Sequence, residues 1–233
     1  MSALLEARAL RKVYRGGGDS LIEVLNAVDL EVYRGEMVAV VGASGAGKST
    51  LLHLLGALDR PTGGEVALGG EAYASLTDAA RDRLRNREIG FIFQFHHLLR
   101  EFTALENVMM PLRIAGVAAS LARSRAEVVL AQVGLAGRMT HRPGQLSGGE
   151  QQRCAVARAI VHDPKVVLAD EPSGNLDHAH GSQLHELLAG LARTLETALV
   201  VATHNRELAE RADRVLLLEH GRLRPATAAE AMS

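Results

Sequence analysis

The 233-residue chain contains a single cysteine, no tryptophan and only three lysines beside 23 arginines, and its formal net charge is −1. The lone Cys154 excludes an internal disulfide, which is typical of a protein from a reducing compartment. The nearly balanced charge gives no support for a general affinity for nucleic acid, because that would need a clear excess of positive charge. No nucleic-acid partner is therefore expected.

Long apolar segments are also missing. Hydrophobic residues make up 47% of the chain, yet no uninterrupted apolar run approaches the roughly 18 residues expected of a membrane span. Residues 1–14 lack the apolar core of a signal peptide. We therefore expect a chain that stays in the cytosol and reaches a membrane only through a partner. Its length is compatible with one domain carrying sub-domains.

The most informative stretch is the glycine-rich segment of residues 42–50, which fits the pattern G-x-x-x-x-G-K-[S/T]. It follows an apolar run and precedes a helix-like segment, as a phosphate-binding loop requires. Glycines let consecutive backbone N–H groups point into one concavity, and the helix adds the positive end of its dipole. We expect Lys48 to reach the β- and γ-phosphates and the Ser49 hydroxyl to bind Mg²⁺. The expected nucleotide-binding residues of this loop are Gly42, Ala43, Ser44, Gly45, Ala46, Gly47, Lys48, Ser49 and Thr50.

Two adjacent carboxylates, Asp170 and Glu171, end the apolar segment of residues 166–169. In a phosphate-loop protein, ligands bind at the carboxyl ends of the strands. Asp170 is expected to hold the Mg²⁺ shell and Glu171 to act on an attacking water as base or orienter. Without the phosphate loop, a strand that ends in Asp-Glu would indicate a solvated turn.

Residues 146–153 have the sequence LSGGEQQR, in which Ser147 and Glu150 have the spacing of a capping box. The simple interpretation is a helix start. Two consecutive glycines are costly in a helix, however, unless something must approach the backbone. A second phosphate-binding helix N-terminus, which includes Ser147 and Gly149, explains them better.

Strands and helices alternate along the chain, which predicts a mostly parallel sheet covered on both faces. Strands are expected at residues 3–14, 21–34, 37–41, 65–68, 89–93, 165–169, 198–203 and 215–218. Helices are expected after the phosphate loop and at residues 75–87, 103–114, 120–133, from 147 onward, and 178–194. A turn at residues 16–19 joins the first two strands, and residues 225–233 are expected to form a frayed tail. Residues of about 95–160 read as a helical insertion between strands.

The phosphate loop, residues 146–153, the Asp170–Glu171 pair and His204 occur in the order and spacing of an ATP-binding-cassette (ABC) ATPase. This resemblance covers residues 3 to about 224. It implies an α/β fold with a P-loop NTPase (RecA-like) core, a small N-terminal antiparallel β sub-domain and an inserted helical sub-domain. Residues 1–233 would then form a single ABC ATPase domain, with ATP and Mg²⁺ as cofactors.

The resemblance also implies roles for individual residues. Tyr14 resembles the aromatic that stacks on adenine, and Gln94 the glutamine that touches Mg²⁺ and the attacking water. His204 resembles the switch histidine that contacts the γ-phosphate. Residues 173–177 resemble a loop that crosses the interface of a dimer. Without the resemblance these would be an ordinary strand tyrosine, a polar strand end, a capping histidine and a plain turn. Asn205 stands where the family usually has aspartate, and either residue caps a helix well.

In this family two cassettes pack head to tail. Ser147 and Gly149 of one copy would therefore close over ATP held by Lys48 of the other. The resemblance thus implies a homodimer with two composite sites. Glu171, His204, Gln94 and Lys48 would be the catalytic residues of each site, and Ser49, Gln94 and Asp170 its metal ligands.

Residues 93–99 and 102–108, FQFHHLL and FTALENV, resemble the ATPases of the lipoprotein-releasing (Lol) system of Gram-negative bacteria. The resemblance implies two membrane-spanning permease subunits, contacted near Gln94–Phe102, and a peripheral position on the cytoplasmic face of the inner membrane. Lipoproteins, contacted only indirectly, would be released to a periplasmic carrier. The related ATPases of macrolide exporters and cell-division complexes share much of this segment and are the alternative.

Two other classes fit less well. Nucleic-acid-associated ABC ATPases carry a long coiled coil between the phosphate loop and the LSGGE segment, whereas here that interval is about a hundred residues without sustained heptads. A small-molecule kinase would share the phosphate loop but would not need residues 146–150.

Overall fold

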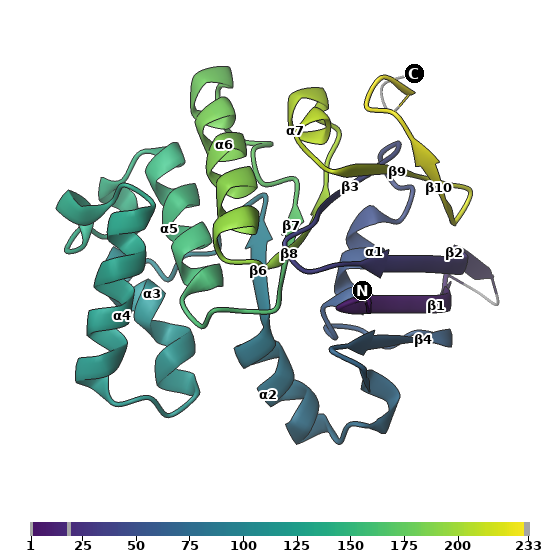
Figure 1. Ribbon diagram of the computed structural model, residues 1–233, viewed down its shortest axis with the longest axis horizontal. Coiled ribbons are helices and arrows are strands. Elements are labelled where there is room, and N and C mark those ends of the chain that lie inside the picture. The colour runs from purple at the N-terminus through teal and green to yellow at the C-terminus, as the bar shows by residue number, and fades with distance from the viewer. Residues whose placement is uncertain (1, 18–19, 231–233) are drawn as a thin grey trace.

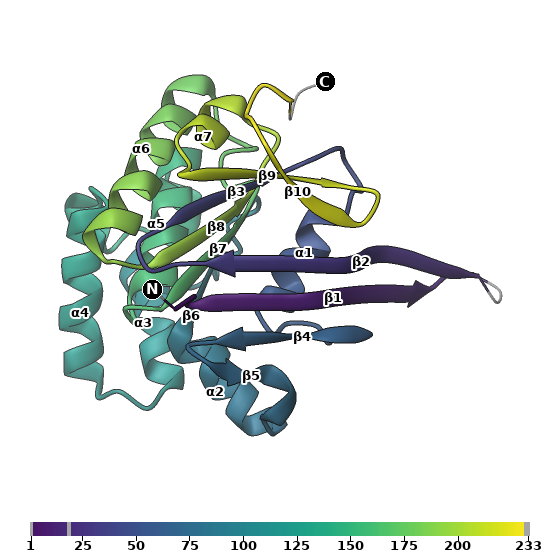
Figure 2. The ribbon, with the colours of Figure 1, turned by 45° about the vertical axis from the view of Figure 1, so that its right-hand side comes forward.

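The computed structural model describes residues 2–17 and 20–230, and its strands form two sheets (Figures 1 and 2). The smaller sheet is antiparallel, in the order β2-β1-β4-β5, with bounds Leu21–Val32, Leu5–Arg15, Gly63–Leu68 and Glu71–Ala72. The larger sheet has the order β10-β9-β3-β8-β7-β6, with bounds Arg222–Ala226, Arg214–Glu219, Met37–Val41, Ala198–Ala202, Val166–Asp170 and Ile89–Phe93. Its neighbouring strands run parallel except β9 and β10. The expected α/β fold class is confirmed.

Helices cover both faces of the larger sheet because its central strands are apolar at every position. In β8, Ala198, Val200 and Ala202 pack in the cluster that contains α1, while Leu199 and Val201 pack in the cluster that contains α5 and α6. This alternation follows from the two-residue period of a strand. Helix α1 thus lies between the two sheets (Figure 2). The helices are α1 Lys48–Leu55, α2 Asp78–Glu88, α3 Ala104–Ile114, α4 Ala119–Gln132, α5 Gly148–Ile160, α6 His178–Thr194 and α7 Arg206–Glu210.

Helices α3, α4 and α5 lie together at one side of the molecule (Figure 1, left). Leu112, Leu130 and Cys154, one from each helix, are fully buried in their shared cluster. Burial raises the pKa of the Cys154 thiol to about 12, so this side chain is an inert core residue. No helix within residues 2–17 and 20–230 has the length and apolarity needed to cross a bilayer.

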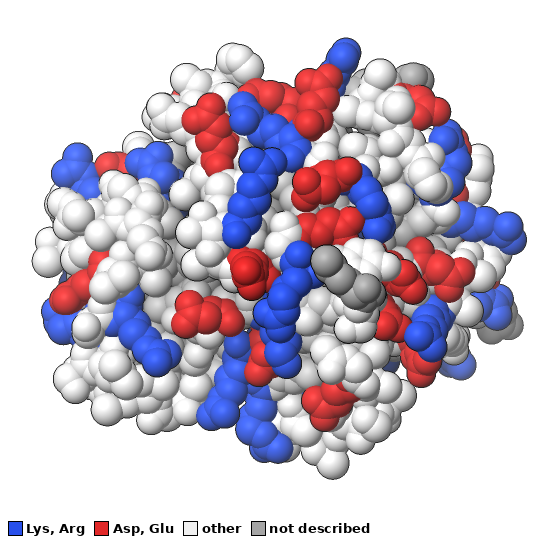
Figure 3. Space-filling model, in the orientation of Figure 1, with Lys and Arg blue, Asp and Glu red and all other residues white. Residues whose placement is uncertain are grey.

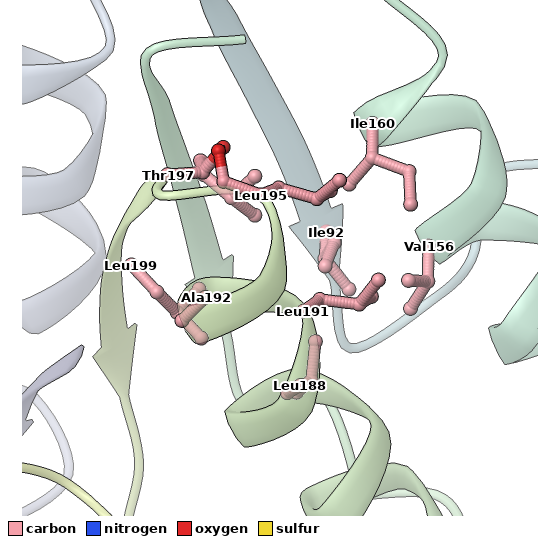
Figure 4. Close-up of a pocket in the computed structure, with 10 residues that line it drawn as sticks. Ile92, Val156, Ile160, Leu188, Leu191, Ala192, Leu195, Thr197 and Leu199 are labelled. Carbon is pink, nitrogen blue, oxygen red and sulfur yellow. The ribbon is translucent and has the colours of Figure 1, made fainter. Parts of the chain in front are cut away.

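A small apolar cavity of about 10 Å³ lies between α5, α6 and the sheet (Figure 4). Its walls come from Val156 and Ile160 of α5, from Leu188 and Leu191 of α6, and from Ile92 of β6. It has room for about one water molecule and offers almost no polar partner, so it holds no substrate.

The prediction that a frayed tail begins at residue 225 was wrong. Residues 222–226 form an additional strand, β10, that pairs with β9 across the two-residue turn His220–Gly221. Both turn residues have positive φ, 50° and 74°, which is the geometry of a tight hairpin turn. The strand was not predicted because Arg222, Arg224 and Pro225 give it no apolar pattern. Such residues occur in strands mainly at sheet edges. Of the expected tail, residues 227–230 form a turn held by Thr227 and Glu230, and residues 231–233 lie outside the described residues.

Most other expected elements are confirmed within a few residues. Helix α6 has the expected bounds, and the capping box at the start of α3 is present, with Glu106 N donating to Thr103 Oγ1 at 3.2 Å. Helix α7 was not predicted, but Asn205 caps it, accepting from Leu208 N at 3.0 Å. Gly18 and Asp19 of the expected first turn lie outside the described residues.

Asn107 of α3 fastens the irregular segment that joins β6 to α3. Its side chain is fully buried and accepts a hydrogen bond from Leu99 N at 2.8 Å. Its amide group shares its hydrogens among the carbonyls of Leu99, Phe102 and Thr103 at 2.9 to 3.1 Å. This one side chain therefore satisfies four backbone groups of a segment that has no regular secondary structure.

We expect Asn107→Leu to lower the free energy of unfolding by on the order of 3 kcal/mol, because buried backbone groups lose their partners. Asn86→Leu is the matched control, since Asn86 is half-buried and makes one hydrogen bond, at 3.3 Å, to Pro111 O. Urea unfolding monitored by circular dichroism measures both. Equal losses for the two variants would contradict the role given to Asn107.

Candidate active site

A cavity of about 670 Å³ opens at the carboxyl ends of the parallel strands. Its volume lies within the range of small-molecule sites. It is lined by Val24, Ser44, Gly45, Gly47, Lys48, Ser49, Thr50, Gln94, Asp170, Glu171 and His204. The side chains that were expected to act on phosphate, metal and water thus converge in one place, because β3, β6, β7 and β8 end at the same edge.

The loop between β3 and α1 depends on glycine. Gly47, the residue before α1, has φ 106°, and a Cβ there would lie 2.9 Å from Val24 Cγ1. Gly45 has φ 80°. Side chains are strained at such angles, whereas glycine is not. The loop therefore brings its backbone N–H groups and the free N–H groups of the first turn of α1 toward the cavity.

Lys48 lies across this loop. Its ammonium group donates to Gly42 O at 2.8 Å and to Ala43 O at 3.2 Å, and the side chain is buried. These two bonds use two of three donors, and no carboxylate in the described part of the chain pairs with the charge. An anion in the cavity would provide it, and phosphate is the anion that the loop geometry suits. Gly42, Ala43 and Ala46 do not line the cavity but form the backbone that holds Lys48 and the turn.

Glu171 follows β7 directly and is paired with His204. Its Oε1 lies 2.8 Å from His204 Nδ1, and its Oε2 accepts from Thr203 Oγ1 and from His204 N, both at 3.2 Å. The carboxylate is mostly buried while the histidine ring is 70% exposed. The two residues that follow β8 thus fix the Glu171 carboxylate at the wall of the cavity, where it can accept a proton from a water molecule.

Ser49, Gln94 and Asp170 bring a hydroxyl, an amide and a carboxylate oxygen to the same cavity. The described residues contain no cluster of three or more His, Cys, Asp or Glu side chains that could hold a metal. Zinc-like sites of nitrogen and sulfur ligands are therefore not formed there. Mg²⁺ takes a few protein oxygens and completes its shell with water and phosphate, so the donor set fits Mg²⁺ with a bound nucleotide.

Gln94 is held by the loop of residues 173–177. Its carbonyl accepts from Asn175 Nδ2 at 2.9 Å, and its amide lies 3.4 Å from Asn175 Oδ1. Gly174 packs directly against the Gln94 side chain, since a Cβ there would lie 2.9 Å from Gln94 Nε2. The end of β6 is therefore in direct contact with the loop after Glu171.

Ser147 and Gly149 do not line this cavity. Ser147 is exposed at the start of α5 and forms the expected capping box: its Oγ accepts from Glu150 N at 3.3 Å, and its N donates to Glu150 Oε2 at 2.8 Å. These contacts and Arg138 hold the pKa of Glu150 at about 2. The Ser147 side chain is exposed, so a ligand that approaches from outside the chain can reach its hydroxyl. Gly149 also has a local reason, because a Cβ there would lie 2.9 Å from the His180 ring.

Tyr14 also lies outside the residues that line the cavity. Its hydroxyl donates to Asp59 Oδ2 at 2.9 Å, and the Lys12 ammonium lies 4.8 Å from its ring centroid. Lys12 in turn forms an ion pair with Asp59 at 2.8 Å. The ring is therefore fixed at its edge and on one face, and its adenine-stacking role stays a prediction.

Sequence reasoning missed four residues of this region. Val24 lines the cavity from β2, Thr203 and Asn175 hold Glu171 and Gln94, and Asp59 orients Tyr14. Thr203 and Asn175 lie inside recognised segments and could have been assigned. Val24 and Asp59 carry no local signal, because only the tertiary fold brings Val24 of β2 to the cavity and Asp59 of the loop after α1 to Tyr14.

Comparison with known proteins agrees with this geometry. Residues 25–174 match the family described as ABC transporter. Proteins named "Lipoprotein-releasing system ATP-binding protein LolD" are 56% identical in Geobacter metallireducens, over 96% of this chain and 99% of the relative, and 53% identical in Legionella pneumophila, over 94% and 96%. The fold is similar to a bacterial ABC transporter cassette solved as a dimer, with a TM-score of 0.87 and 36% identity over 96% of this chain and 98% of the other. The same values hold for that cassette in a post-hydrolysis state bound to ADP and Pi.

We expect Lys48→Ala to weaken ATP binding by at least about tenfold, because a charge-assisted hydrogen bond to phosphate is lost. Lys165→Ala is the matched control, since Lys165 is half-exposed and forms only an ion pair with Glu88, at 3.3 Å. Isothermal titration calorimetry measures both affinities. Undiminished binding by the Lys48 variant would contradict the assignment of the loop.

Proposed function

The chain belongs to the ABC transporter family, and from this premise we propose that it is the ATP-hydrolysing subunit of an inner-membrane complex that releases lipoproteins to a periplasmic carrier. The observation that carries the proposal is the convergence of Lys48, Ser49, Asp170, Glu171 and His204 on one cavity. The relatives named for lipoprotein release, similar over nearly the whole chain, support the choice of cargo.

Hydrolysis follows from the positions of these side chains. The glycine loop and Lys48 would bind the β- and γ-phosphates. Ser49, Asp170 and Gln94 would hold Mg²⁺, which would neutralise charge on the phosphate oxygens. Glu171 takes a proton from the attacking water, and His204, 2.8 Å from that carboxylate, contacts the γ-phosphate. Tyr14 stacks on the adenine.

A second copy of the chain completes each site. Ser147 and Gly149 lie outside the phosphate cavity of their own chain, at the N-terminus of α5. Gly149 is buried there, but Ser147 is exposed, and a helix N-terminus suits an anion presented by another molecule. The similar cassette solved as a dimer supports a head-to-tail pair. ATP then acts as a bridge between the copies, and its hydrolysis releases them. The pair of copies thus has two states, closed around ATP and open after hydrolysis, and the γ-phosphate favours the closed state.

The permease partners bind beside the segment of residues 94–102. Phe95, Leu99 and Phe102 are exposed by 64%, 42% and 38%, so this irregular segment presents an apolar surface. A neighbouring groove of about 350 Å³ is lined by Arg85, Asn86, Ile89, Gly90, Phe91, Phe93, His97, Pro111, Arg158, Ala159 and His162. None of these residues is acidic, and Arg158 donates only to the carbonyls of His96 and His97. An apolar cytoplasmic helix of the permease with an acidic side chain fits this surface.

The chain acts peripherally, on the cytoplasmic side of the membrane, and touches the cargo only through the permeases. Removing an acyl chain from a bilayer costs about 0.8 kcal/mol per buried CH₂, so a multiply acylated anchor needs an external energy source. ATP hydrolysis supplies it.

An ABC ATPase of the macrolide-exporter or cell-division type is the second candidate, because those proteins share much of the segment from Phe93 to Val108. A nucleic-acid partner is disfavoured. On the face shown in Figure 3, basic and acidic side chains are interspersed and form no large patch of one sign.

We expect Glu171→Gln to bind ATP and remain as a dimer with little turnover, because the amide cannot accept a proton from water. Size-exclusion chromatography with ATP and a phosphate-release assay measure the two properties. Glu196→Gln is the control, since Glu196 is exposed and does not line the cavity. A Glu171 variant that stays monomeric with ATP would contradict the proposed dimer.

We expect Phe95→Asp to abolish co-purification with the permeases from solubilised membranes while leaving nucleotide affinity unchanged, because the apolar contact surface is lost. Leu121→Asp is the matched control, since Leu121 is an exposed apolar residue of α4 with 50% exposure. Mass spectrometry of the captured membrane proteins identifies the partners. Equal capture by both variants would exclude this docking surface.

A further inference from the structure

A buried histidine on α6 lies outside the catalytic cavity. The His185 side chain is 1% exposed and does not line the cavity. Its neighbours along α6, Leu184 and Leu188, are buried apolar residues. An imidazole in such a place is costly unless its nitrogens find partners, so its polar contacts need an explanation.

The two ring nitrogens of His185 face two different segments. Nε2 lies 2.9 Å from Ser173 Oγ, whereas Nδ1 lies 3.7 Å from Glu207 Oε2, beyond hydrogen-bond distance. The Glu207 carboxylate is fixed by Ser182 Oγ at 2.7 Å and by Arg211 at 3.0 Å. These two donors hold its pKa at about 2, so it is ionised.

The tautomer of His185 follows from these neighbours. Burial lowers the pKa of the ring, so it is neutral at pH 7. The charged or titratable groups near it are Glu207 and Arg211 from α7 and its end, and His178 on α6. The carboxylate beside Nδ1 favours the proton on that nitrogen, which leaves Nε2 to accept a hydrogen bond from the Ser173 hydroxyl.

The two segments that contact His185 are close in sequence to Glu171 and His204, the proposed catalytic pair. Ser173 follows Glu171 by two residues, and Glu207 follows His204 by three. Helices α6 and α7 pack side by side (Figure 1), which places His185 between the loop after β7 and the helix after His204. His185 is therefore in contact with the segments that carry both members of the pair.

The backbone at Glu171 makes such support necessary. Its φ is 44°, in the left-handed region that a glutamate rarely adopts. Strained residues keep such angles only where the surrounding structure holds them. Glu171 N donates to Ala202 O at 2.9 Å, and Gly174 N donates to Glu171 O at 3.0 Å. The bond from Ser173 to His185 adds a side-chain anchor two residues later.

We propose that His185 is a positioning residue for ATP hydrolysis: it holds Ser173 on one side and faces Glu207 on the other, and so keeps the Glu171 carboxylate in place against the His204 ring. This proposal rests on the proposed function, in which Glu171 and His204 act on ATP. Because His185 does not touch the cavity, it affects the rate of hydrolysis and not the affinity for nucleotide.

The test compares His185→Phe, His185→Gln and Ser173→Ala in the full chain by steady-state ATP hydrolysis. We expect His185→Phe to lower kcat by about tenfold, with KM for ATP unchanged within about twofold, because the reacting groups are displaced while the phosphate loop is intact. His185→Gln should retain more activity, since its amide can still reach Ser173. Ser173→Ala should reproduce the loss, and the double variant should be no worse than either single one.

Thr197→Val is the matched control for lost stability. Thr197 is buried beyond the C-terminal end of α6 and donates to Pro164 O at 3.0 Å, so its loss also removes a buried hydrogen bond. We expect a lower unfolding temperature with unchanged kcat. A wild-type kcat for His185→Phe, or for Ser173→Ala if the first variant does not fold, would overturn the proposal.

The same assays separate this inference from the proposed function. An active wild-type chain with an inactive Glu171→Gln variant keeps the function even if His185→Phe is unaffected. A wild-type chain that hydrolyses no ATP would overturn both.

Discussion

The position of every proposed catalytic group depends on one constraint, that the parallel strands β3, β6, β7 and β8 end at the same edge of the sheet. Each strand is apolar along its length and changes to polar residues where it ends, so the phosphate loop, Gln94, Asp170 and the segment with His204 meet there. The glycine loop meets a second, local requirement. Its left-handed residues Gly45 and Gly47 turn the chain sharply enough to bring backbone N–H groups and Lys48 to the same point. Side chains at these positions would open the loop.

Sequence predicted most of the fold and the phosphate half of the site, because both follow from local patterns. Apolar strands, capping residues and the spacing of glycines are properties of short segments. Strand β10 was missed because Arg222, Arg224 and Pro225 give an edge strand no apolar signature. The roles of Val24, Asp59 and His185 were missed for a different reason: each depends on a partner more than a few residues away in the sequence, and nothing local indicates that partner.

The separation of Ser147 from the phosphate cavity is the basis for the proposed sharing of each site by two copies. Within one chain, α5 begins in a satisfied capping box at the exposed Ser147, while the Lys48 ammonium pairs with no carboxylate of residues 2–17 and 20–230. The N-terminus of α5 and the Lys48 ammonium are each stable within one chain. Each nevertheless lacks an anionic ligand, which the proposed nucleotide between two copies would provide. In the proposed dimer, a triphosphate between two copies would contact both, so nucleotide binding would drive association and hydrolysis would reverse it. The loop of residues 173–177 contacts both Gln94 and His185. It therefore connects the proposed association of two copies with the proposed hydrolysis of ATP.

The central claim, that two copies share each site, is tested most directly by mixing two inactive variants. One chain carries Lys48→Ala and the other Ser147→Arg, so each homodimer has two damaged sites. In a mixed head-to-tail dimer, both substitutions fall in one site and the other site is intact. We expect the equimolar mixture to recover up to about a quarter of the wild-type ATP hydrolysis rate, since about half of the dimers are mixed and each has one intact site. A mixture that is no faster than the mean of the two variants would contradict the shared site.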